Sequence, residues 1–208
     1  MSGLRQRLAD LIVAAGYGHG PRLASALRKR WAKLRNPGAR IEFGPGVYAG
    51  PGFSIHAPVG GAFTVGAGVE FRRNFRLELA APDARVSVGA GCYFTYDVII
   101  ACSTSIDIGE RVGRGQCTFV VDGNHRFRDL KRPFTEQGYD YRRLKIESDA
   151  QVHSKVTVVE SIGERAVIGA NAVVSRPIPP FTVAAGVPAR VVDYFGPPEL
   201  APPDWKER

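Results

Sequence analysis

The sequence predicts an all-β domain built as a parallel β-helix, preceded by a short helical arm. Apolar residues recur every six positions from residue 43 onward. The 24 glycines and 15 prolines are spread among Val and Ile, which is typical of many tight turns rather than of disorder. With 208 residues, 44% of them hydrophobic, the chain is long enough for one main domain with appendages. We therefore expect an arm over residues 1–40, a β-helix domain over 41–195 and a tail over 196–208.

The arm contains two helical candidates and most of the charge imbalance. Residues 4–15 have apolar positions at helical spacing, and a second candidate runs from Leu23 to Leu34 before Asn36-Pro37-Gly38 ends it. The first 40 residues hold nine Lys and Arg against one acidic residue, whereas the rest of the chain is balanced and the whole carries +8. Two interpretations stay open: the arm contacts anionic lipid or an anionic substrate, or it packs on the domain or a neighbouring subunit with its cations in solvent. Nucleic-acid binding is not expected, because no aromatic series interleaves the basic residues.

The six-residue period predicts the architecture of the domain. Six residues supply one strand and one turn, and three such units close a coil of eighteen residues with one apolar side chain pointing inward on each side. The positions expected to point inward are Phe43, Ala49, Ile55, Val65, Phe71, Leu77, Val88, Phe94, Ile100, Ile108, Arg114, Val120, Ile146, Val152, Val158, Ile162, Ile168 and Val174. Arg114 is a charged residue in this series, which we interpret as a fault in the register or an opened corner.

Two segments fall outside the repeats. Residues 126–145 form a polar, aromatic and basic excursion that is too long for a turn, and loops of this length are usually functional or disordered. The proline-rich tail from Gly196 is expected to be a poorly ordered extension, and we assign it no function.

Composition also limits the class of protein. The three cysteines, Cys92, Cys102 and Cys117, form no CxxC pair, so we expect small buried side chains on strands rather than a disulfide or a zinc site. No apolar run is long enough to cross a bilayer, and no signal peptide is recognised at the N-terminus. The expected location is the cytoplasm, with residues 1–40 as a candidate for peripheral contact with the inner face of the membrane.

His125 is the candidate catalytic residue. It follows the apolar run Phe119-Val120-Val121 and directly precedes the excursion. Histidine can accept a proton near neutral pH, so one well-placed copy can act as a general base. On this stretch alone, an ordinary surface or core histidine is the simpler interpretation.

The repeats, together with three segments, resemble the hexapeptide-repeat acyltransferases, and within them the O-acetyltransferases of sugars and xenobiotics. The resemblance covers about residues 41 to 193. The segments are Ile162-Gly163-Glu164-Arg165-Ala166-Val167-Ile168-Gly169-Ala170-Asn171-Ala172-Val173-Val174, the C-terminal stretch Ile178-Pro179-Pro180-Phe181-Thr182-Val183-Ala184-Ala185-Gly186-Val187-Pro188-Ala189-Arg190-Val191-Val192, and Asn124-His125-Arg126. The resemblance implies a left-handed parallel β-helix, a hand that periodicity cannot give.

The resemblance also implies an activity. It implies a homotrimer that binds acetyl-CoA as cosubstrate in the cleft between subunits, without a metal. His125 is then the general base that deprotonates a hydroxyl of a carbohydrate acceptor, such as a glycan, glycolipid or polysaccharide precursor. Family positions that touch the cofactor map onto Ser154, Ala170, Ser175, Arg176 and Arg190. Positions on the acceptor side map onto Tyr93, Thr95 and Asp97.

Departures from the family pattern keep alternatives open. Gln151-Val152-His153 stands where the family usually has Trp-Ile-Gly, the coil from Ile146 is two residues short, and Asp193 replaces a common basic residue. The alternatives are N-acetylation of a sugar amine and a β-helix trimer without catalytic activity. A metal enzyme of the γ-carbonic-anhydrase type is not favoured, because His19, His56, His125 and His153 lack the close pairing that a three-histidine zinc site needs.

Overall fold

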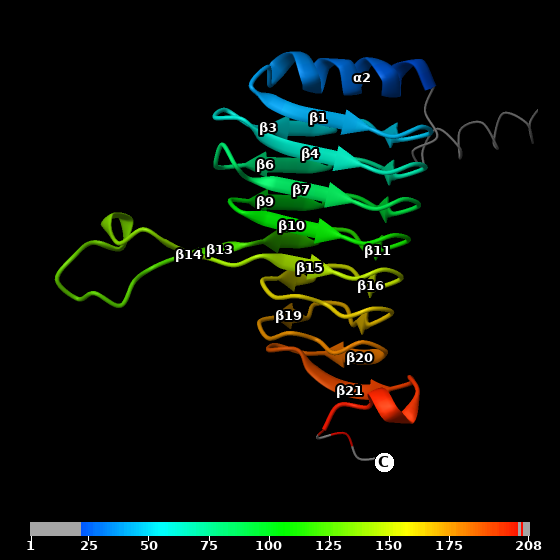
Figure 1. The fold of residues 1–208 in the computed structure, drawn as a ribbon, viewed down its shortest axis with the longest axis vertical. Helices are drawn as coiled ribbons and strands as arrows, with labels where there is room; N and C mark the ends of the chain where they lie inside the picture. Colours follow the sequence, from blue (N-terminus) through cyan, green and yellow to red (C-terminus); the bar gives the residue numbers. More distant parts are fainter. Residues whose placement is uncertain (1–21, 204, 206–208) are drawn as a thin grey trace, which may run out of the picture.

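The computed structural model describes residues 22–203 and residue 205. They form a column of stacked coils, with one helix lying across its N-terminal end and a long hairpin projecting from its side (Figure 1). The strands of successive coils stack into three sheets, which we number in the order in which the chain meets them. In each coil, we call the turn that joins the second sheet to the third the 2–3 corner. We call the turn that leads from the third sheet to the first sheet of the next coil the 3–1 corner.

The strands are short, and those of the column pair in parallel except at its C-terminal end. The first sheet contains β1 (Ala39–Phe43), β4 (Gly61–Val65), β7 (Arg85–Val88), β10 (Ser105–Ile108) and β15 (Leu144–Ile146). The second contains β2 (Tyr48–Ala49), β5 (Glu70–Phe71), β8 (Tyr93–Phe94), β11 (Gly113–Arg114), β16 (Gln151–Val152), β18 (Val167–Ile168), β20 (Thr182–Ala185) and β21 (Arg190–Tyr194). The third contains β3 (Ser54–His56), β6 (Arg76–Leu79), β9 (Ile99–Cys102), β12 (Phe119–Val121), β17 (Thr157–Val158) and β19 (Val173–Val174). β21 runs antiparallel to β20 at the end of the column.

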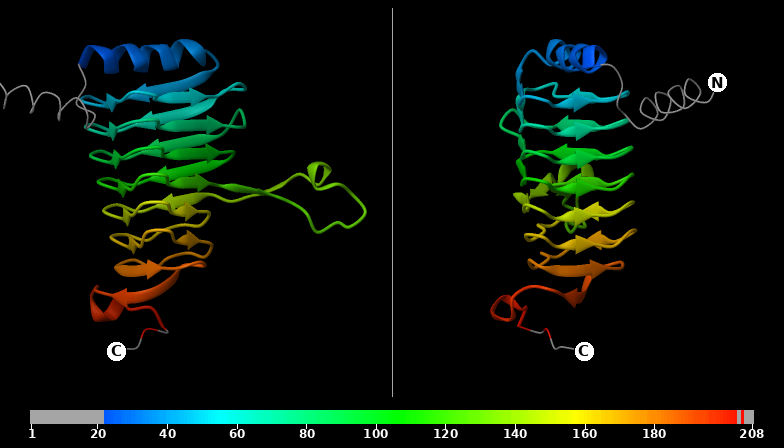
Figure 2. Two further views of the ribbon diagram at one scale, coloured as in Figure 1. Left: turned by 180° about the vertical axis from the view of Figure 1, so that it is seen from behind. Right: turned by 90° about the vertical axis from the view of Figure 1, so that its right-hand side faces the viewer.

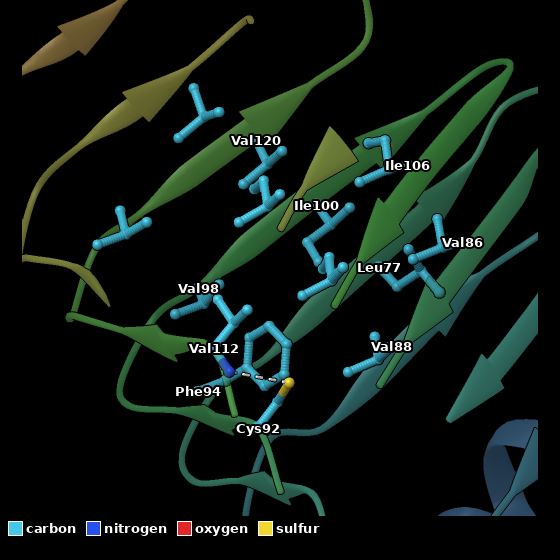
Figure 3. Close-up of a cluster of buried hydrophobic side chains, with 14 of the residues drawn as sticks. Leu77, Val86, Val88, Cys92, Phe94, Val98, Ile100, Ile106, Val112 and Val120 are labelled. Atoms are coloured by element: carbon cyan, nitrogen blue, oxygen red, sulfur yellow. Dashed lines mark hydrogen bonds between the residues drawn. The ribbon is translucent and has the colours of Figure 1, made fainter. Parts of the chain in front are cut away.

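The predicted six-residue register is confirmed. Seventeen of the eighteen positions expected to point inward are buried, and Phe43 is partly buried against the same core. Equivalent residues of successive coils pair in register, as Leu77, Ile100 and Val120 do on the third sheet (Figure 3). The core is therefore one continuous apolar column, and each added coil buries its inward residues against the coils above and below.

The coil is left-handed, as the family resemblance implied. In Figure 1 the near strands of the first sheet point to the right and the far strands of the third sheet point to the left while the chain descends. This hand is opposite to that of the usual crossover between parallel strands of one sheet. Residues in the left-handed backbone conformation recur at the corners, where Asn74, Asp97 and Cys117 have φ values of 59°, 57° and 56°. Asparagine and aspartate are the side chains that tolerate this conformation best after glycine.

The interpretation of Arg114 as a register fault or an opened corner was wrong. Arg114 pairs in register with Phe94 of the coil before and with Val152 of the coil after. Its side chain has 0% exposure, so the guanidinium group lies inside a closed coil.

The second predicted helix is confirmed as α2 (Arg22–Arg35), which lies across the N-terminal end of the column (Figure 2). Asn36 ends the helix: its side-chain amide donates to the carbonyl of Ala32 and also to that of Ile55, and its amide oxygen accepts from the N–H of Ala57. The helix thereby covers the first coil, whose backbone groups have no preceding coil to pair with. The first helical candidate, residues 4–15, lies outside the described residues.

The excursion is a β-hairpin that leaves the column at a 3–1 corner between β12 and β15 (Figures 1 and 2). Its strands are β13 (Gly123–His125) and β14 (Tyr139–Tyr141), and a 3-10 turn, η1 (Phe134–Glu136), lies in its outer part. The structure differs from the expected span of 126–145 at both ends. β13 begins before residue 126, and Leu144 and Lys145 already belong to β15.

The cysteines divide into two kinds. Cys92 and Cys102 are buried, as expected. The expectation of a buried strand position was wrong for Cys117, which is exposed at the 2–3 corner that follows β11. Beyond β21, Phe195 contacts the ring of Phe181 and a 3-10 turn, η2 (Pro198–Leu200), begins the tail.

Candidate functional site

His125 lies at the base of the projecting hairpin and not on the column itself. As the last residue of β13 it pairs with Tyr139 of β14 across the hairpin. The Tyr139 ring lies 4.1 Å from the imidazole, centroid to centroid, and the Phe134 ring meets it edge-on at 5.4 Å. The imidazole is half-buried, and its Nδ1 atom is buried without a hydrogen-bond partner among the described residues. Aromatic packing rather than a hydrogen bond therefore holds the ring within the single chain.

Asp122 fixes the corner from which the hairpin departs. Its side chain is 1% exposed. One carboxylate oxygen accepts from the N–H of Ser103 at 2.8 Å, and the other accepts from the N–H and the hydroxyl of Thr104 at 2.6 and 3.0 Å. The carbonyl of Asp122 accepts from the N–H of Arg142 on the returning strand. Asp122 thus ties both hairpin strands to the preceding coil.

A buried thiol also contacts this corner. The Cys102 thiol donates to the Asp122 carboxylate over 3.3 Å. Burial raises the pKa of Cys102 well above its ordinary value, and the neighbouring carboxylate raises it further. The thiol therefore stays protonated near neutral pH and acts as a donor to Asp122.

The three residues expected on the acceptor side lie on or just after β8, away from the hairpin corner. The Tyr93 hydroxyl contacts Oε1 of Gln151 at 3.2 Å, and the Thr95 hydroxyl donates to the carbonyl of Arg114 at 3.0 Å. Asp97 accepts from the side-chain amide of Asn74 at 2.8 Å. Thr95 and Asp97 belong to a 2–3 corner, and there their hydrogen bonds join adjacent coils.

The residues expected to bind the cofactor fall on two corners and one sheet edge. Ser154 and Ala170 occupy 2–3 corners, after β16 and β18. Ser175 and Arg176 follow β19 on the 3–1 corner, the same corner that carries the hairpin two coils earlier. Arg190 begins β21, where its guanidinium donates to the carbonyl of Ala189. Ala170, Ser175, Arg176 and Arg190 are all exposed.

The structure does not bring all of these residues together within one chain. His125, Ser175 and Arg176 belong to 3–1 corners, whereas Thr95, Asp97, Ser154 and Ala170 belong to 2–3 corners. The third sheet separates the two sets, because it joins these two corners in each coil. A single site that contains both sets therefore needs the 3–1 corner of one chain to face the 2–3 corner of another.

Sequence reasoning missed the surroundings of His125. The aromatic residues of the excursion were visible, but the pairing of Tyr139 with His125 depends on the hairpin register, which the six-residue period does not contain. It also missed a groove of about 630 Å³ over the first sheet and an adjoining hollow of about 270 Å³ at the hairpin base. Arg85 and Arg143 line both, and Tyr141 lines the smaller one. The groove alone is of the size that small-molecule sites have.

Among the residues that the structure describes, no group of three or more His, Cys, Asp or Glu side chains is placed to hold a metal ion. Within the same residues, no helix is both long and apolar enough to span a bilayer.

The curated proteins that the chain resembles in sequence are named as acetyltransferases. No protein-family model matches the chain. A protein of Mycobacterium tuberculosis named as a probable acetyltransferase is 30% identical over 149 residues, which are 70% of this chain and 49% of the relative. The galactoside O-acetyltransferase of Escherichia coli is 29% identical over 112 residues, 52% of this chain and 54% of the relative. The chain thus spans about half the length of these curated relatives.

A solved structure shares the fold. A mutant of the AntD N-acyltransferase of Bacillus cereus, in complex with dTDP-4-amino-4,6-dideoxyglucose and coenzyme A, superposes with a TM-score of 0.63. Its sequence is 12% identical, and the superposition covers 82% of this chain and 90% of that one. At this identity the likeness concerns the fold alone.

Proposed function

Because the chain belongs to the hexapeptide-repeat acyltransferase family, we propose that it transfers an acetyl group from acetyl-CoA to a hydroxyl of a carbohydrate. The observation that carries the proposal is His125, a lone imidazole held by Tyr139 and Phe134 at the base of the hairpin. The relative that acts on galactosides supports an oxygen acceptor on a sugar.

The exposed residues fit a donor of this kind. The pantetheine arm of coenzyme A is slender and its phosphates are anionic, so its site needs small side chains beside cations. Ala170 and Ser175 are small and exposed, and Arg176 and Arg190 form no ion pair among the described residues. Ser154 is half-buried on the corner before Ala170, and its carbonyl accepts from the N–H of Asn171. We assign these five residues to the donor and Tyr93, Thr95 and Asp97 to the acceptor.

The chain's own part in the reaction is proton transfer and positioning. Acetyl-CoA, when bound, supplies an activated acyl group. His125 accepts the proton of the acceptor hydroxyl as that oxygen attacks the acyl carbon, and it returns the proton to the departing sulfur. The carbon–oxygen bond forms and the carbon–sulfur bond breaks, so protons and electrons balance without a covalent enzyme intermediate.

The oligomer and the membrane contact are part of the same proposal. A homotrimer would place the 3–1 corner of one subunit beside the 2–3 corner of the next, which would bring the two sets of proposed site residues together. A carbohydrate or glycolipid acceptor fits a cytoplasmic enzyme that contacts the inner face of the membrane through residues 1–40, whose first half lies outside the described residues.

The test is release of coenzyme A thiol from acetyl-CoA with a panel of sugars. The native protein should show acceptor-dependent release, and His125→Ala should reduce kcat by about 100-fold or more. His56→Ala is the matched control: His56 is exposed on β3 in the first coil, outside the residues assigned to the site, and we expect near-native rates. Equal acceptor-dependent release from the native and His125→Ala proteins would refute the role of His125.

The same assay separates the alternatives. One alternative is N-acetylation of a sugar amine. Amino sugars in the panel would then be acetylated in preference to their hydroxyl counterparts. A trimer without catalytic activity predicts that coenzyme A fails to raise the melting temperature, whereas a binding protein should be stabilised in proportion to ligand excess.

A further inference from the structure

α2 exposes its large apolar side chains rather than burying them. Leu23, Leu27, Trp31 and Leu34 are 71, 59, 61 and 67% exposed. At 100° per residue these four positions fall within one narrow face of the helix, so they form a continuous apolar stripe. We call this set the α2 stripe. Soluble helices that pack on a domain normally turn such a face toward the core.

The opposite face of α2 is fixed to the first coil by polar contacts. The Ser25 hydroxyl accepts from the N–H of Ala49, and Arg28 donates to the carbonyl of the same residue at 3.0 Å. Lys29 donates to the carbonyl of Val47 at 2.7 Å. These side chains pair with backbone groups that no preceding coil can satisfy. The helix therefore cannot rotate its stripe inward without leaving those groups unpaired.

The charges around the stripe indicate the kind of partner that it binds. α2 contains six basic residues and no acidic one. Arg30 lies on one side of the stripe and Arg35 on the other, and the Arg35 guanidinium lies 5.9 Å from the Trp31 ring. A second copy of α2 laid against the stripe would bring cations against cations. A helix with Leu and Trp on one face and flanking cations has the composition of helices that lie in the interface of anionic membranes.

We propose that the α2 stripe docks the N-terminal end of the column on an anionic lipid surface. α2 lies across that end, so docking leaves the hairpin and the three sheets away from the lipid (Figure 2). Trp31 and the leucines enter the boundary between headgroups and acyl chains, and Arg30 and Arg35 contact the lipid phosphates. The inference rests on the proposed membrane contact but not on acyl transfer. Acyl transfer is measured separately, with a water-soluble acceptor.

The experiment follows the fluorescence of Trp31 in the full chain. The sequence has two tryptophans, so Trp205→Phe leaves Trp31 as the only one. We expect vesicles of phosphatidylcholine with phosphatidylglycerol to shift its emission to the blue, and phosphatidylcholine alone to do so at least about tenfold more weakly. No shift with anionic vesicles would overturn the proposal. So would an emission that is already blue without lipid, because another segment or a second copy would then cover the stripe.

Variants then test which residues make the contact. Leu23→Gln with Leu27→Gln should lower the fraction that sediments with anionic vesicles by at least about tenfold, since two large apolar groups no longer enter the lipid. Leu130→Gln is the matched control, because Leu130 is a leucine that is 98% exposed on the hairpin, far from α2. Arg30→Gln with Arg35→Gln should weaken the preference for anionic lipid, because two of the six cations of α2 are removed. Unchanged sedimentation of the double leucine variant contradicts the assignment, whether or not the protein acetylates sugars.

Discussion

At the scale of single residues, Arg114 is the least expected feature of the core. It heads the largest fully buried side chains, and its three guanidinium nitrogens have no hydrogen-bond partner among the described residues. The compensating contact is the Phe94 ring, whose centroid lies 5.6 Å from the guanidinium carbon. Burial lowers the pKa of Arg114 to about 10. Because this pKa lies below the unfolded value, the cost of the buried charge is fully present below pH 10 and is lost only as the pH rises toward the unfolded pKa.

We predict that Arg114→Met stabilises the protein at neutral pH. A methionine fills much of the same space without a charge, and replacing buried ionic groups by apolar ones is often stabilising by about 1–4 kcal/mol. The gain should appear as a melting temperature several degrees higher. Arg114→Lys keeps a buried charge and should show no gain. A lower melting temperature for Arg114→Met would mean that the contact with Phe94 outweighs the cost of burial.

The sequence predicted the inward position of Arg114 but not the burial of its charged side chain in a closed coil. The six-residue period placed it inward correctly, and the general rule that charges avoid the core then led to the wrong interpretation. The period is reliable because every coil repeats it against two neighbours, so one exception cannot shift the register. Side chains that point outward carry no such repeated constraint. This is why the roles given to His125, Ser154 and Arg190 came from a family resemblance and stay predictions.

At the scale of elements, the hairpin depends on one buried carboxylate. The Asp122 carboxylate accepts hydrogen bonds from the N–H of Ser103 and from the N–H and hydroxyl of Thr104. Its backbone carbonyl accepts from the N–H of Arg142. The hairpin itself is mostly exposed, and its ion pair between Arg126 and Asp140 lies in solvent. Exposed pairs of this kind contribute little to stability. The orientation of the hairpin, and with it the position of His125, is therefore set at its base.

We predict that Asp122→Ala loosens the hairpin more than it disrupts the column. Removing a buried charged acceptor leaves its donors unpaired, at a cost of about 3 kcal/mol. Trypsin should then cut within residues 126–132 at least about tenfold faster, because local opening becomes more frequent. Asp193→Ala is the control, since Asp193 is an exposed aspartate on β21, at the C-terminal end of the column. Equal cleavage of the Asp122→Ala and native proteins would show that other contacts hold the hairpin.

The ends of the hairpin illustrate where sequence reasoning stops at this scale. The period marks where the repeats stop and resume, but Gly123 to His125 continue as extended chain after β12 and look no different from a coil strand. Only their antiparallel pairing with residues 139–141 separates them from the column. That pairing is formed across an intervening loop, so no local sequence pattern predicts it. The corner contacts of Asp122 are equally invisible, because they join residues about twenty positions apart.

At the scale of the whole molecule, the column separates the predicted site residues. His125, Ser175 and Arg176 lie on 3–1 corners, and Ser154 and Ala170 lie on 2–3 corners at the other edge of the third sheet. Sheet geometry fixes this separation, because the register is the same in every coil. In the proposed trimer each site takes its general base from one subunit and its 2–3 corner from the next.

A shared site predicts that two inactive variants restore activity to each other. His125→Ala removes the base, and Ala170→Trp places a bulky side chain on an exposed corner position, which should block the donor without disturbing the core. Each variant alone should be nearly inactive. In a mixed trimer, one interface in three pairs a native His125 with a native Ala170 of the neighbouring chain, so trimers purified through a different tag on each variant should recover about a third of the native rate. If each site were built within one chain, every subunit of the mixture would carry a defect, and the mixed trimers would be no more active than the two variants measured apart.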